Sequence, residues 1–256
     1  MAADRSGERC SGGGLDVCWV SDLGAARENN EDACLALPSE GLLAVSDGMG
    51  GERAGEVASA LVVQWLPGLV AEHVGRLENP PQHDVESALQ EAVVALNHRL
   101  RIECSVFGNA NKMGATVALV LVRGRSAHVG HMGDSRVYLF RDGKLERLTR
   151  DHSVASMLLE RRAITEEQAE CHPMKGQLAR YVGMGGEGRA DVRTIELRGG
   201  DWLLLCTDGL TESLSDETIQ DLLNKHHQLD RACQALLSAA RSRDNITVLI
   251  AQRQGE

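Results

Sequence analysis

The sequence predicts an α+β fold, because its strands and helices come in blocks. Three short strand-like segments open the chain, two long amphipathic helices follow, and a second series of strands begins near residue 114. Alternating strand and helix units, the pattern of a parallel sheet, are not seen, so antiparallel sheets with separate groups of helices are expected. With 256 residues the chain can bury a substantial core, and we expect one domain.

The first part of the chain is expected to hold a flexible tail and a meander of strands. Residues 1–14 are polar and include the run Ser11-Gly-Gly-Gly14, which predicts a tail before a domain over residues 15–256. Strands are predicted at 15–21, 33–37 and 41–46. Their connections are too short for helical crossovers, which favours an antiparallel meander.

Two long helices are predicted from apolar residues that recur at i, i+3, i+4 and i+7. The first covers 54–69, and Pro67-Gly68 is expected to mark its end. The second covers 85–100. The connection at 70–83 holds two prolines and several charges, so we expect it to be exposed.

The second half of the chain returns to strands, interrupted by one segment of different character. Strands are predicted at 115–122, 126–131, 136–141, 145–149, 192–197, 202–206 and 246–251, and helices at 216–224 and 230–242. Asp142-Gly143 is a hairpin signal. The segment from about 150 to 190 has short helical stretches, one with a Thr165–Gln168 capping box, but lacks a core pattern. It is predicted to be a mobile flap.

Composition excludes several classes of partner. The net charge is −10 and only seven aromatic residues are present (Trp 3, Tyr 2, Phe 2), so nucleic acid is not expected to bind. No apolar run approaches membrane-spanning length and no signal segment is visible, which predicts a cytoplasmic protein that does not bind membranes. The seven scattered cysteines are expected to be reduced. No long coiled-coil pattern is present, so we expect a monomer.

Four aspartates lie where apolar strands begin or end: Asp47, Asp134, Asp208 and Asp244. Each one alone is better explained as an ordinary turn or cap residue. If they converge, however, two carboxylates about 4 Å apart repel by roughly 4 kcal/mol at an effective dielectric near 20. Hard divalent cations such as Mg²⁺ or Mn²⁺ would offset that repulsion. Two such ions roughly 3.5–4 Å apart activate a water, which predicts hydrolysis of an anionic substrate.

The loop at 21–32 carries an arginine a few residues before two acids. Its charge pattern is that of an ordinary solvated loop. The functional alternative is that Arg27 binds two phosphate oxygens while Glu31 and Asp32 hold metal-bound waters. The residues of the loop alone leave both interpretations open.

Seven short motifs in this order closely resemble the metal-dependent protein serine/threonine phosphatases of the protein phosphatase 2C type, in their short bacterial form. They are S-D-L-G-A-A-R-E-N-N-E-D-A from residue 21, V-S-D-G-M-G-G from 45, K-M-G-A-T from 112, G-H-M-G-D-S-R from 130, L-T-R-D-H-S from 148, C-T-D-G-L from 206 and R-D-N-I-T-V from 243. The resemblance covers the chain from about residue 15 to its end. It implies an αββα sandwich, in which two antiparallel β-sheets are flanked by pairs of antiparallel helices.

The resemblance also implies roles for the residues at matching positions. Asp47 would bridge two Mn²⁺ or Mg²⁺ ions, the Gly48 carbonyl would bind one of them, and Asp208 and Asp244 would complete the other. Asp134 would serve a third, weaker metal shared with Asp208.

The remaining matching positions surround those ions. Arg27 matches the phosphate-binding arginine, and Glu31 and Asp32 match acids around the metal-bound waters. Asn245 follows the last ligand and is expected to orient it within this network.

One position departs from the pattern. Eukaryotic members have a histidine after the bridging Asp-Gly and use it as a general acid, whereas this chain has Met49. The leaving group must then be protonated by metal-bound water or by another residue. His152 is a candidate, although a structural role is the stronger expectation for it.

The implied activity is hydrolysis of phosphoserine and phosphothreonine monoesters in proteins. The resemblance implies phosphoprotein partners, among them a bacterial Ser/Thr kinase and its substrates. The stretch L-A-R-Y-V-G-M from residue 178 is similar to the flap end of bacterial phosphatases paired with a kinase, some of them tied to type VI secretion. The alternatives are a catalytically inactive phosphoprotein-binding scaffold of the same fold and a two-metal phosphodiesterase or nuclease, against which the acidic composition argues.

Overall fold

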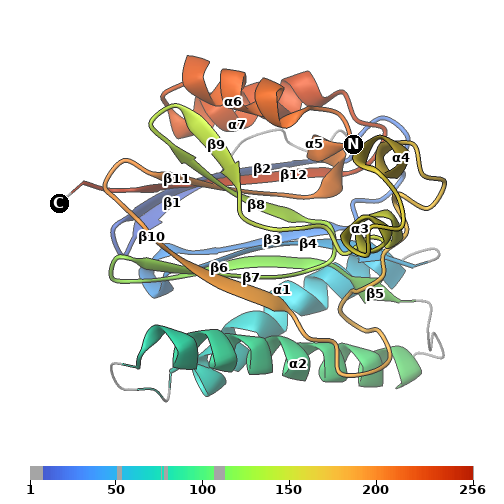
Figure 1. The fold of residues 1–256 in the computed structure, drawn as a ribbon. Coiled ribbons are helices and arrows are strands. Elements are labelled where there is room, and N and C mark those ends of the chain that lie inside the picture. The colour runs from blue at the N-terminus through green and yellow to red at the C-terminus, as the bar shows by residue number, and fades with distance from the viewer. Residues whose placement is uncertain (1–7, 51–53, 76, 78–79, 107–112, 256) are drawn as a thin grey trace.

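Two antiparallel sheets stack face to face between two pairs of helices, as Figure 1 shows for this computed structural model. The structure describes residues 8–50, 54–75, 77, 80–106 and 113–255. The first sheet has the order β1 (Glu8–Gly12), β2 (Leu15–Asp22), β12 (Ile246–Arg253), β11 (Trp202–Cys206), β8 (Arg136–Arg141), β9 (Lys144–Arg147). The second has the order β10 (Asp191–Glu196), β7 (Ser126–Met132), β6 (Val117–Arg123), β4 (Leu42–Met49), β3 (Asp32–Leu37), with β5 (Gly114–Ala115) paired to β4.

The helices cover the two outer faces of the sandwich. The pair α1 (Ala54–His73) and α2 (Gln82–Val106) lies on the second sheet, and the pair α6 (Asp216–Lys225) and α7 (Leu229–Ala240) lies on the first (Figure 1). Short helices η1 (Pro38–Glu40), α3 (Val154–Glu160), α4 (Glu166–Glu170) and α5 (Asp208–Thr211) lie in the connections. The αββα sandwich implied by the sequence motifs is confirmed.

Alternation along the strands fills three separate core layers. In β4, Leu42 and Ala44 pack towards α1 and α2, whereas Leu43 and Val45 pack between the sheets. In β12, residues of one parity likewise face α6 and α7, and those of the other parity face the second sheet. Successive side chains of a strand point to opposite faces, so strands covered on both sides are apolar at nearly every position.

The predicted flexible tail at 1–14 is wrong for residues 8–12, which form β1 and pair with β2. The glycine run forms the turn of this hairpin, because Gly13 and Gly14 have φ of 56° and 76°. Positive φ at two successive residues is the requirement of a tight hairpin turn, and glycine meets it without steric cost. Residues 1–7 lie outside the described part of the chain.

The predicted meander of the first three strands is also wrong. β2 pairs with β12 in the first sheet, while β3 and β4 pair with each other in the second. The chain thus crosses between sheets through the loop after Asp22, and this crossing carries Arg27 and Glu31 to the end of the sandwich. By contrast, the hairpin at Asp142-Gly143 is confirmed.

Helix α1 does not end at Pro67 but continues to His73. Beyond the proline, Leu69 and Val70 are still buried in the core, and this packing offsets the loss of one backbone hydrogen bond. By length and composition α1 could cross a membrane, contrary to the expectation for this sequence. Its buried face nevertheless packs against the second sheet and α2, as in the core helix of a globular domain.

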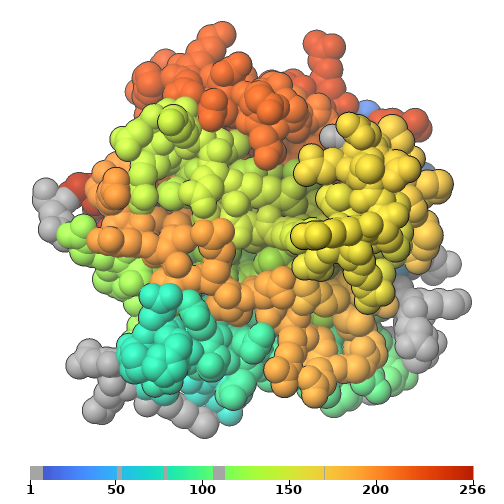
Figure 2. All heavy atoms as spheres, in the orientation of Figure 1, coloured from blue at the N-terminus to red at the C-terminus, as the bar shows by residue number. Residues whose placement is uncertain are grey.

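The segment between β9 and β10 leaves the sandwich at one end. It contains α3 and α4, and the predicted capping box of Thr165 and Gln168 is confirmed at the start of α4. Figure 2 shows the part of this segment that carries α3 and α4, in yellow, on the visible face of the molecule. Its mobility as a flap stays a prediction.

Candidate metal centre

Side-chain parity places an acidic cluster between the sheets at one end of the sandwich. Asp47 follows Leu43 and Val45 on the inner face of β4, and Asp32 lies opposite it in the register of β3. Directly opposed residues of an antiparallel pair share a face, so both carboxylates point between the sheets. β4 continues beyond the predicted strand end, because Gly48 and Met49 pair with β5.

Threonine residues, one from each sheet, hold these two acids. Thr207 donates its hydroxyl proton to Asp32 Oδ2 at 2.8 Å, while its oxygen accepts the Thr247 N–H at 2.9 Å. Likewise, the Asp47 N–H donates to Thr116 Oγ1 at 2.8 Å, and the Thr116 N–H donates back to the Asp47 carbonyl at 2.8 Å. The Asp32 carboxylate is therefore fixed by a hydroxyl of the first sheet, and the backbone of Asp47 is fixed by Thr116 of the second.

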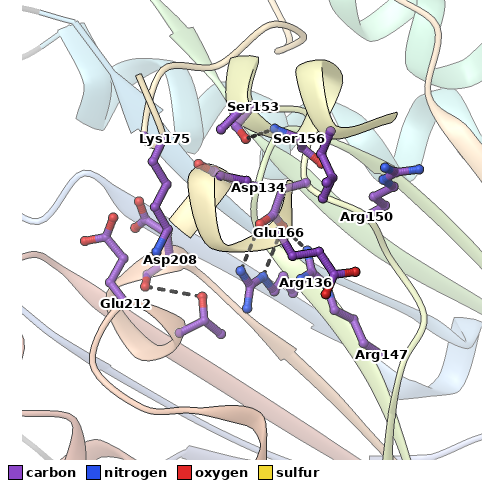
Figure 3. A pocket seen from close by; sticks show the side chains of 16 residues that line it. Asp134, Arg136, Arg147, Arg150, Ser153, Ser156, Glu166, Lys175, Asp208 and Glu212 are labelled. Carbon is purple, nitrogen blue, oxygen red and sulfur yellow. Dashed lines mark hydrogen bonds and ion pairs between the residues drawn. The ribbon is translucent and has the colours of Figure 1, made fainter. Parts of the chain in front are cut away.

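Asp208 and Asp134 complete the inner part of the cluster. Asp208 is the first residue of α5 and follows Thr207 at the end of β11. Asp134 lies in the turn between β7 and β8. Both side chains line a cavity of about 390 Å³ that extends under α3 and α4 (Figure 3). Lys175 and Glu212 also line this cavity, so the cluster opens towards the flap.

Asp244 lies at the outer edge of the cluster with the arginine of the loop. Arg27 Nη2 donates to Asp244 Oδ2 at 2.6 Å, and Arg27 Nη1 lies 3.6 Å from Glu31 Oε2. The hydrogen bond to Asp244 is the main reason that the pKa of Arg27 is raised. The Arg27 side chain is 46% exposed, so it remains accessible to a ligand from solvent.

Asn245 anchors the loop that carries Arg27. Its side-chain oxygen accepts the Glu31 N–H at 2.8 Å, and its amide nitrogen donates to the carbonyls of Leu23 at 2.8 Å and Asn29 at 3.1 Å. The oxygen and the nitrogen of this buried side-chain amide are thus both hydrogen-bonded to the backbone of the loop. The geometry assigns Asn245 to positioning the loop, whereas its predicted part in a network of metal-bound waters stays a prediction.

Gly48 brings a carbonyl next to the Glu31 side chain at the start of α1. A Cβ atom on Gly48 would lie 1.9 Å from the Gly55 carbonyl oxygen, so no larger residue fits there. A Cβ on Gly55 would in turn lie 2.7 Å from the Gly48 oxygen and 2.3 Å from Glu31 Oε1. These two oxygens therefore face one small space. Gly51, the last residue of the motif V-S-D-G-M-G-G, lies outside the described residues.

The pKa values of the acids report how closely they gather. Burial, together with the charges of Asp32, Asp208, Asp134 and Asp244, raises the pKa of Asp47 well above its ordinary value. Burial and neighbouring acids also raise the pKa of Asp32 to about 7, that of Asp134 to about 8 and that of Asp208 to about 6. Each of these carboxylates is held where its charged form is unfavourable.

The cluster fits hard divalent cations. Asp32 Oδ1 and Asp208 Oδ1 are buried and have no hydrogen-bond partner among the described residues, which is costly unless another group binds them. The donors at the site are carboxylate and carbonyl oxygens, the ligands that Mg²⁺ and Mn²⁺ prefer. Asp47, Gly48, Asp208, Asp244 and Asp134 would hold the ions.

The structure shows the contacts of Met49 and His152, the two residues that the sequence analysis considered for the general acid. Met49 occupies a paired position in β4 and offers no proton. His152 is 6% exposed, its Nδ1 accepts the Gly133 N–H at 3.2 Å, and its Nε2 lies 3.0 Å from Asp191 Oδ2. The expected structural role of His152 is confirmed.

The sequence interpretation missed the threonines that support the acids. Thr207 directly precedes Asp208, and Thr116 ends the motif K-M-G-A-T, of which Lys112 lies outside the described residues. A small hydroxyl residue beside an acid was visible in the sequence. The partner of Thr207 across the sandwich, Asp32, was not visible, because that pairing depends on how the two sheets stack.

Comparison with known proteins agrees with this geometry. A family model described as Protein phosphatase 2C matches residues 25–246. Serine/threonine protein phosphatase PstP of Mycobacterium tuberculosis is 37% identical over 233 residues, which make up 90% of this chain and 43% of PstP. Serine/threonine phosphatase stp of Listeria monocytogenes is 31% identical over 239 residues, 91% of this chain and 94% of stp. The chain thus spans less than half the length of PstP and nearly all of stp.

Solved structures share the fold. The PstP catalytic domain in complex with 2 manganese ions superposes with a TM-score of 0.76 at 33% identity, covering 93% of this chain and 97% of that one. PppA, a key regulatory component of T6SS in Pseudomonas aeruginosa, superposes with a TM-score of 0.78 at 31% identity, covering 96% and 99%. Family model, relatives and structures match nearly the whole sandwich and its acidic end, and the chain belongs to the protein phosphatase 2C family.

Proposed function

We propose that this protein is a serine/threonine protein phosphatase that hydrolyses phosphoserine and phosphothreonine monoesters with Mn²⁺ or Mg²⁺. The observation that carries the proposal is the gathering of Asp47, Asp208 and Asp244 beside an exposed arginine. Two ions, with a third at Asp134, are supported by the number of acids and by the two buried oxygens that have no partner in the described part of the chain. Membership of the family and the manganese-bound relative agree with this proposal.

Some residues of the site bind the phosphoryl group, and others orient water. When bound, the cations supply Lewis-acid activation of water and neutralise charge on the phosphoryl group. Arg27 turns its guanidinium to two phosphoryl oxygens and exchanges part of its contact with Asp244 for them. Glu31 and Asp32 accept hydrogen bonds from water in the cleft, and Thr207 keeps Asp32 turned towards it.

Protonation of the leaving group does not come from a histidine at the position of Met49. His152 is buried and already hydrogen-bonded at both ring nitrogens, so it does not reach the substrate. We assign the proton to water in the cleft. A serine or threonine alkoxide needs such a proton, because the alcohol it forms is a very weak acid.

The partners follow from the reaction and from the relatives. Phosphoproteins are the substrates, and a Ser/Thr kinase with its own substrates is the natural source of them. The similarity to PppA supports a link to type VI secretion. We further propose a cytoplasmic monomer with one catalytic domain that begins at β1.

The direct test is phosphate release from a phosphothreonine peptide by purified protein with Mn²⁺. Wild type is expected to release phosphate, and Asp208→Asn and Asp244→Asn are expected to lose nearly all activity. Asp221→Asn, at an exposed aspartate of α6, is the matched control and should retain it. Full activity in the two site variants would overturn the proposal, and Mn²⁺ binding without hydrolysis would support a phosphoprotein-binding scaffold instead.

A further inference from the structure

The end of the sandwich opposite the acids carries arginines. Three strands that have an acid near one end have an arginine at the other: β7 lies between Arg125 and Asp134, β11 lies between Arg198 and Asp208, and β12 begins after Asp244 and ends at Arg253. At about 3.3 Å per residue, the acid and the arginine of each strand lie about 25–30 Å apart. Figure 1 shows the arginine end at the left, with the C-terminus, and the acidic end at the right, near α3 and α4.

The three arginines line one cavity. Its volume is about 120 Å³, and its lining consists of Arg125, Leu197, Arg198, Gly199, Arg253 and Gln254. None of these described residues is an acid. In a chain with a net charge of −10, a cavity with three guanidinium groups and no carboxylate in its lining attracts anions locally.

Backbone hydrogen bonds fix the segments that carry the arginines. The Leu197 N–H donates to the Arg125 carbonyl at 2.7 Å, which joins the end of β10 to the turn between β6 and β7. The Arg253 N–H donates to the Asp201 carbonyl at 2.8 Å, and the Arg198 N–H donates to Asp201 Oδ2 at 2.7 Å. The three side chains therefore start from a connected backbone, which lowers the entropy cost of gathering them on a ligand.

The guanidinium groups themselves are weakly engaged. Arg198 is exposed, and its side chain has no ion pair within the described ranges. Arg253 Nη1 donates to the Gly13 carbonyl at 3.4 Å, a long hydrogen bond. Arg125 lies 3.1 Å from Glu196, but both side chains are more than 60% exposed, and exposed ion pairs contribute little. All three groups are thus available to a ligand.

A neutralising acid of the protein itself is the competing interpretation. Asp201 is the buried acid on this side of β11, but Arg141 already occupies its two oxygens at 2.8 and 2.6 Å. Glu196 is exposed and pairs with Arg125 alone among the described residues. Neither carboxylate therefore compensates the charges of Arg198 and Arg253.

We propose that Arg125, Arg198 and Arg253 form an anion site that binds the phosphoryl group of inorganic phosphate or of a phosphoprotein. Guanidinium groups are planar and always charged, and they direct pairs of N–H donors at phosphate oxygens. Three of them from three segments surround an ion, which suits a tetrahedral dianion better than a planar carboxylate. The cavity has room for several water molecules and so for one such group. The inference does not depend on the proposed function, because the two sites share no residue.

The substitutions remove one guanidinium at a time. Arg198→Gln and Arg253→Gln each lose a charge and its hydrogen bonds to the anion, and Arg198→Lys keeps the charge but loses the planar fork. Arg231→Gln is the matched control, because Arg231 is an exposed arginine of α7 outside the cavity. It lowers the net charge of the protein by the same amount as the other two glutamine variants.

The experiment follows backbone amide resonances of the full chain with Mg²⁺ by NMR during titration with inorganic phosphate. Each amide is resolved, so binding at the arginine end is measured separately from any binding at the acids. Phosphate should shift the resonances of residues 125 and 197–200. Arg198→Gln and Arg253→Gln should each raise the Kd for this change about tenfold or more, Arg198→Lys should raise it less, and Arg231→Gln should leave it as in wild type.

A second titration distinguishes the source of the phosphoryl group. It uses a peptide in which a phosphonate that is not hydrolysed replaces the phosphoryl ester of phosphothreonine. Shifts of the same amides by phosphate identify a site for the free ion, and shifts by the peptide alone identify a site for a phosphoprotein. Either result supports the proposal if Arg198→Gln weakens it.

Several results would overturn the proposal. They are the absence of shifts at residues 125 and 197–200 with both probes, an equal Kd for acetate and phosphate, an unchanged Kd in both glutamine variants of the cavity, or the same weakening in Arg231→Gln. Loss of phosphatase activity is not among them, since the site lies at the end away from the acids.

Discussion

Replacing Asp47 with asparagine should stabilise the metal-free protein while removing its response to Mn²⁺. Asp47 lies among Asp32, Asp208, Asp134 and Asp244, and burial and these charges raise its pKa. Asparagine has nearly the same shape but no charge. The substitution therefore relieves the repulsion that cations offset in the loaded enzyme, and it removes the ligand proposed to bridge two of them.

The magnitude follows from the raised pKa values. For Asp32 the change from 3.8 to about 7 corresponds to roughly 4 kcal/mol at higher pH, at about 1.36 kcal/mol per pKa unit. Burial causes the largest part of each raised pKa. The repulsion between the acids causes the rest, and because each pair of acids shares that repulsion, the shifts of the individual acids do not add. Removing one central charge should then recover about 2–3 kcal/mol at pH 8.5. In a protein of this size that raises Tm by about 5–10 °C.

The sign of the pH dependence determines the pH range in which the stabilities of wild type and variant should be compared. A raised folded-state pKa gives stability that is complete below the unfolded value and is lost as pH rises through the folded value. For these acids the loss runs from about pH 4 to above pH 8. His131 opposes it below pH 6.5, because burial lowers its pKa to about 4 and the folded protein then resists protonation. The comparison therefore belongs between pH 6.5 and 8.5.

The assay is thermal unfolding of chelator-treated wild type and Asp47→Asn at pH 6.5 and 8.5, with and without Mn²⁺. Metal-free wild type should lose stability between these pH values, and the variant should lose less. Mn²⁺ should raise Tm of wild type strongly at pH 8.5 and that of the variant far less. A lower Tm for the metal-free variant at pH 8.5, or an undiminished response to Mn²⁺, would refute the reasoning.

Three further predictions concern the rim of the site. Arg27→Lys should lower kcat/KM for a phosphothreonine peptide by about 10- to 100-fold, since it loses the planar fork, with Tm unchanged because the side chain is half exposed. Asn245→Ala should lower stability by about 3 kcal/mol by unpairing three backbone groups, measured by urea unfolding against the exposed Asn224→Ala; a loss below 1 kcal/mol would contradict it. Lys175→Glu should change the preference among phosphopeptides, yet leave hydrolysis of a small aryl phosphate nearly intact, because Lys175 lines the cavity beside the acids; equal effects on both would argue against it.

Much of the acidic site could be predicted from the chain alone. Asp47 and Asp208 each follow a buried strand and precede glycine, and together with Asp134 and Asp244 they indicated a shared site that no single aspartate indicated. Strand parity explains why Asp47 lies among the other acids. An alternating strand that ends in an acid carries it to the face of its apolar neighbours, here the space between two sheets.

The features of the fold and site that the sequence did not predict depend on contacts between distant segments. The residues around β2 do not indicate that this strand pairs with β12, more than 200 residues away. The first strands were therefore assigned to one meander. The glycines at 13 and 14 fit both a flexible tail and a hairpin turn, and only pairing with β2 decides between them. The roles of Asn245 and His152 have the same origin, since each is defined by backbone groups of other segments.

The most direct test of the acidic cluster as a catalytic metal centre is the anomalous scattering of crystals soaked in Mn²⁺. The account predicts two strong peaks among Asp47, Gly48, Asp208 and Asp244, and a weaker third peak beside Asp134. The absence of Mn²⁺ from these acids, or a principal peak at His131, His152 and Asp191, would contradict it.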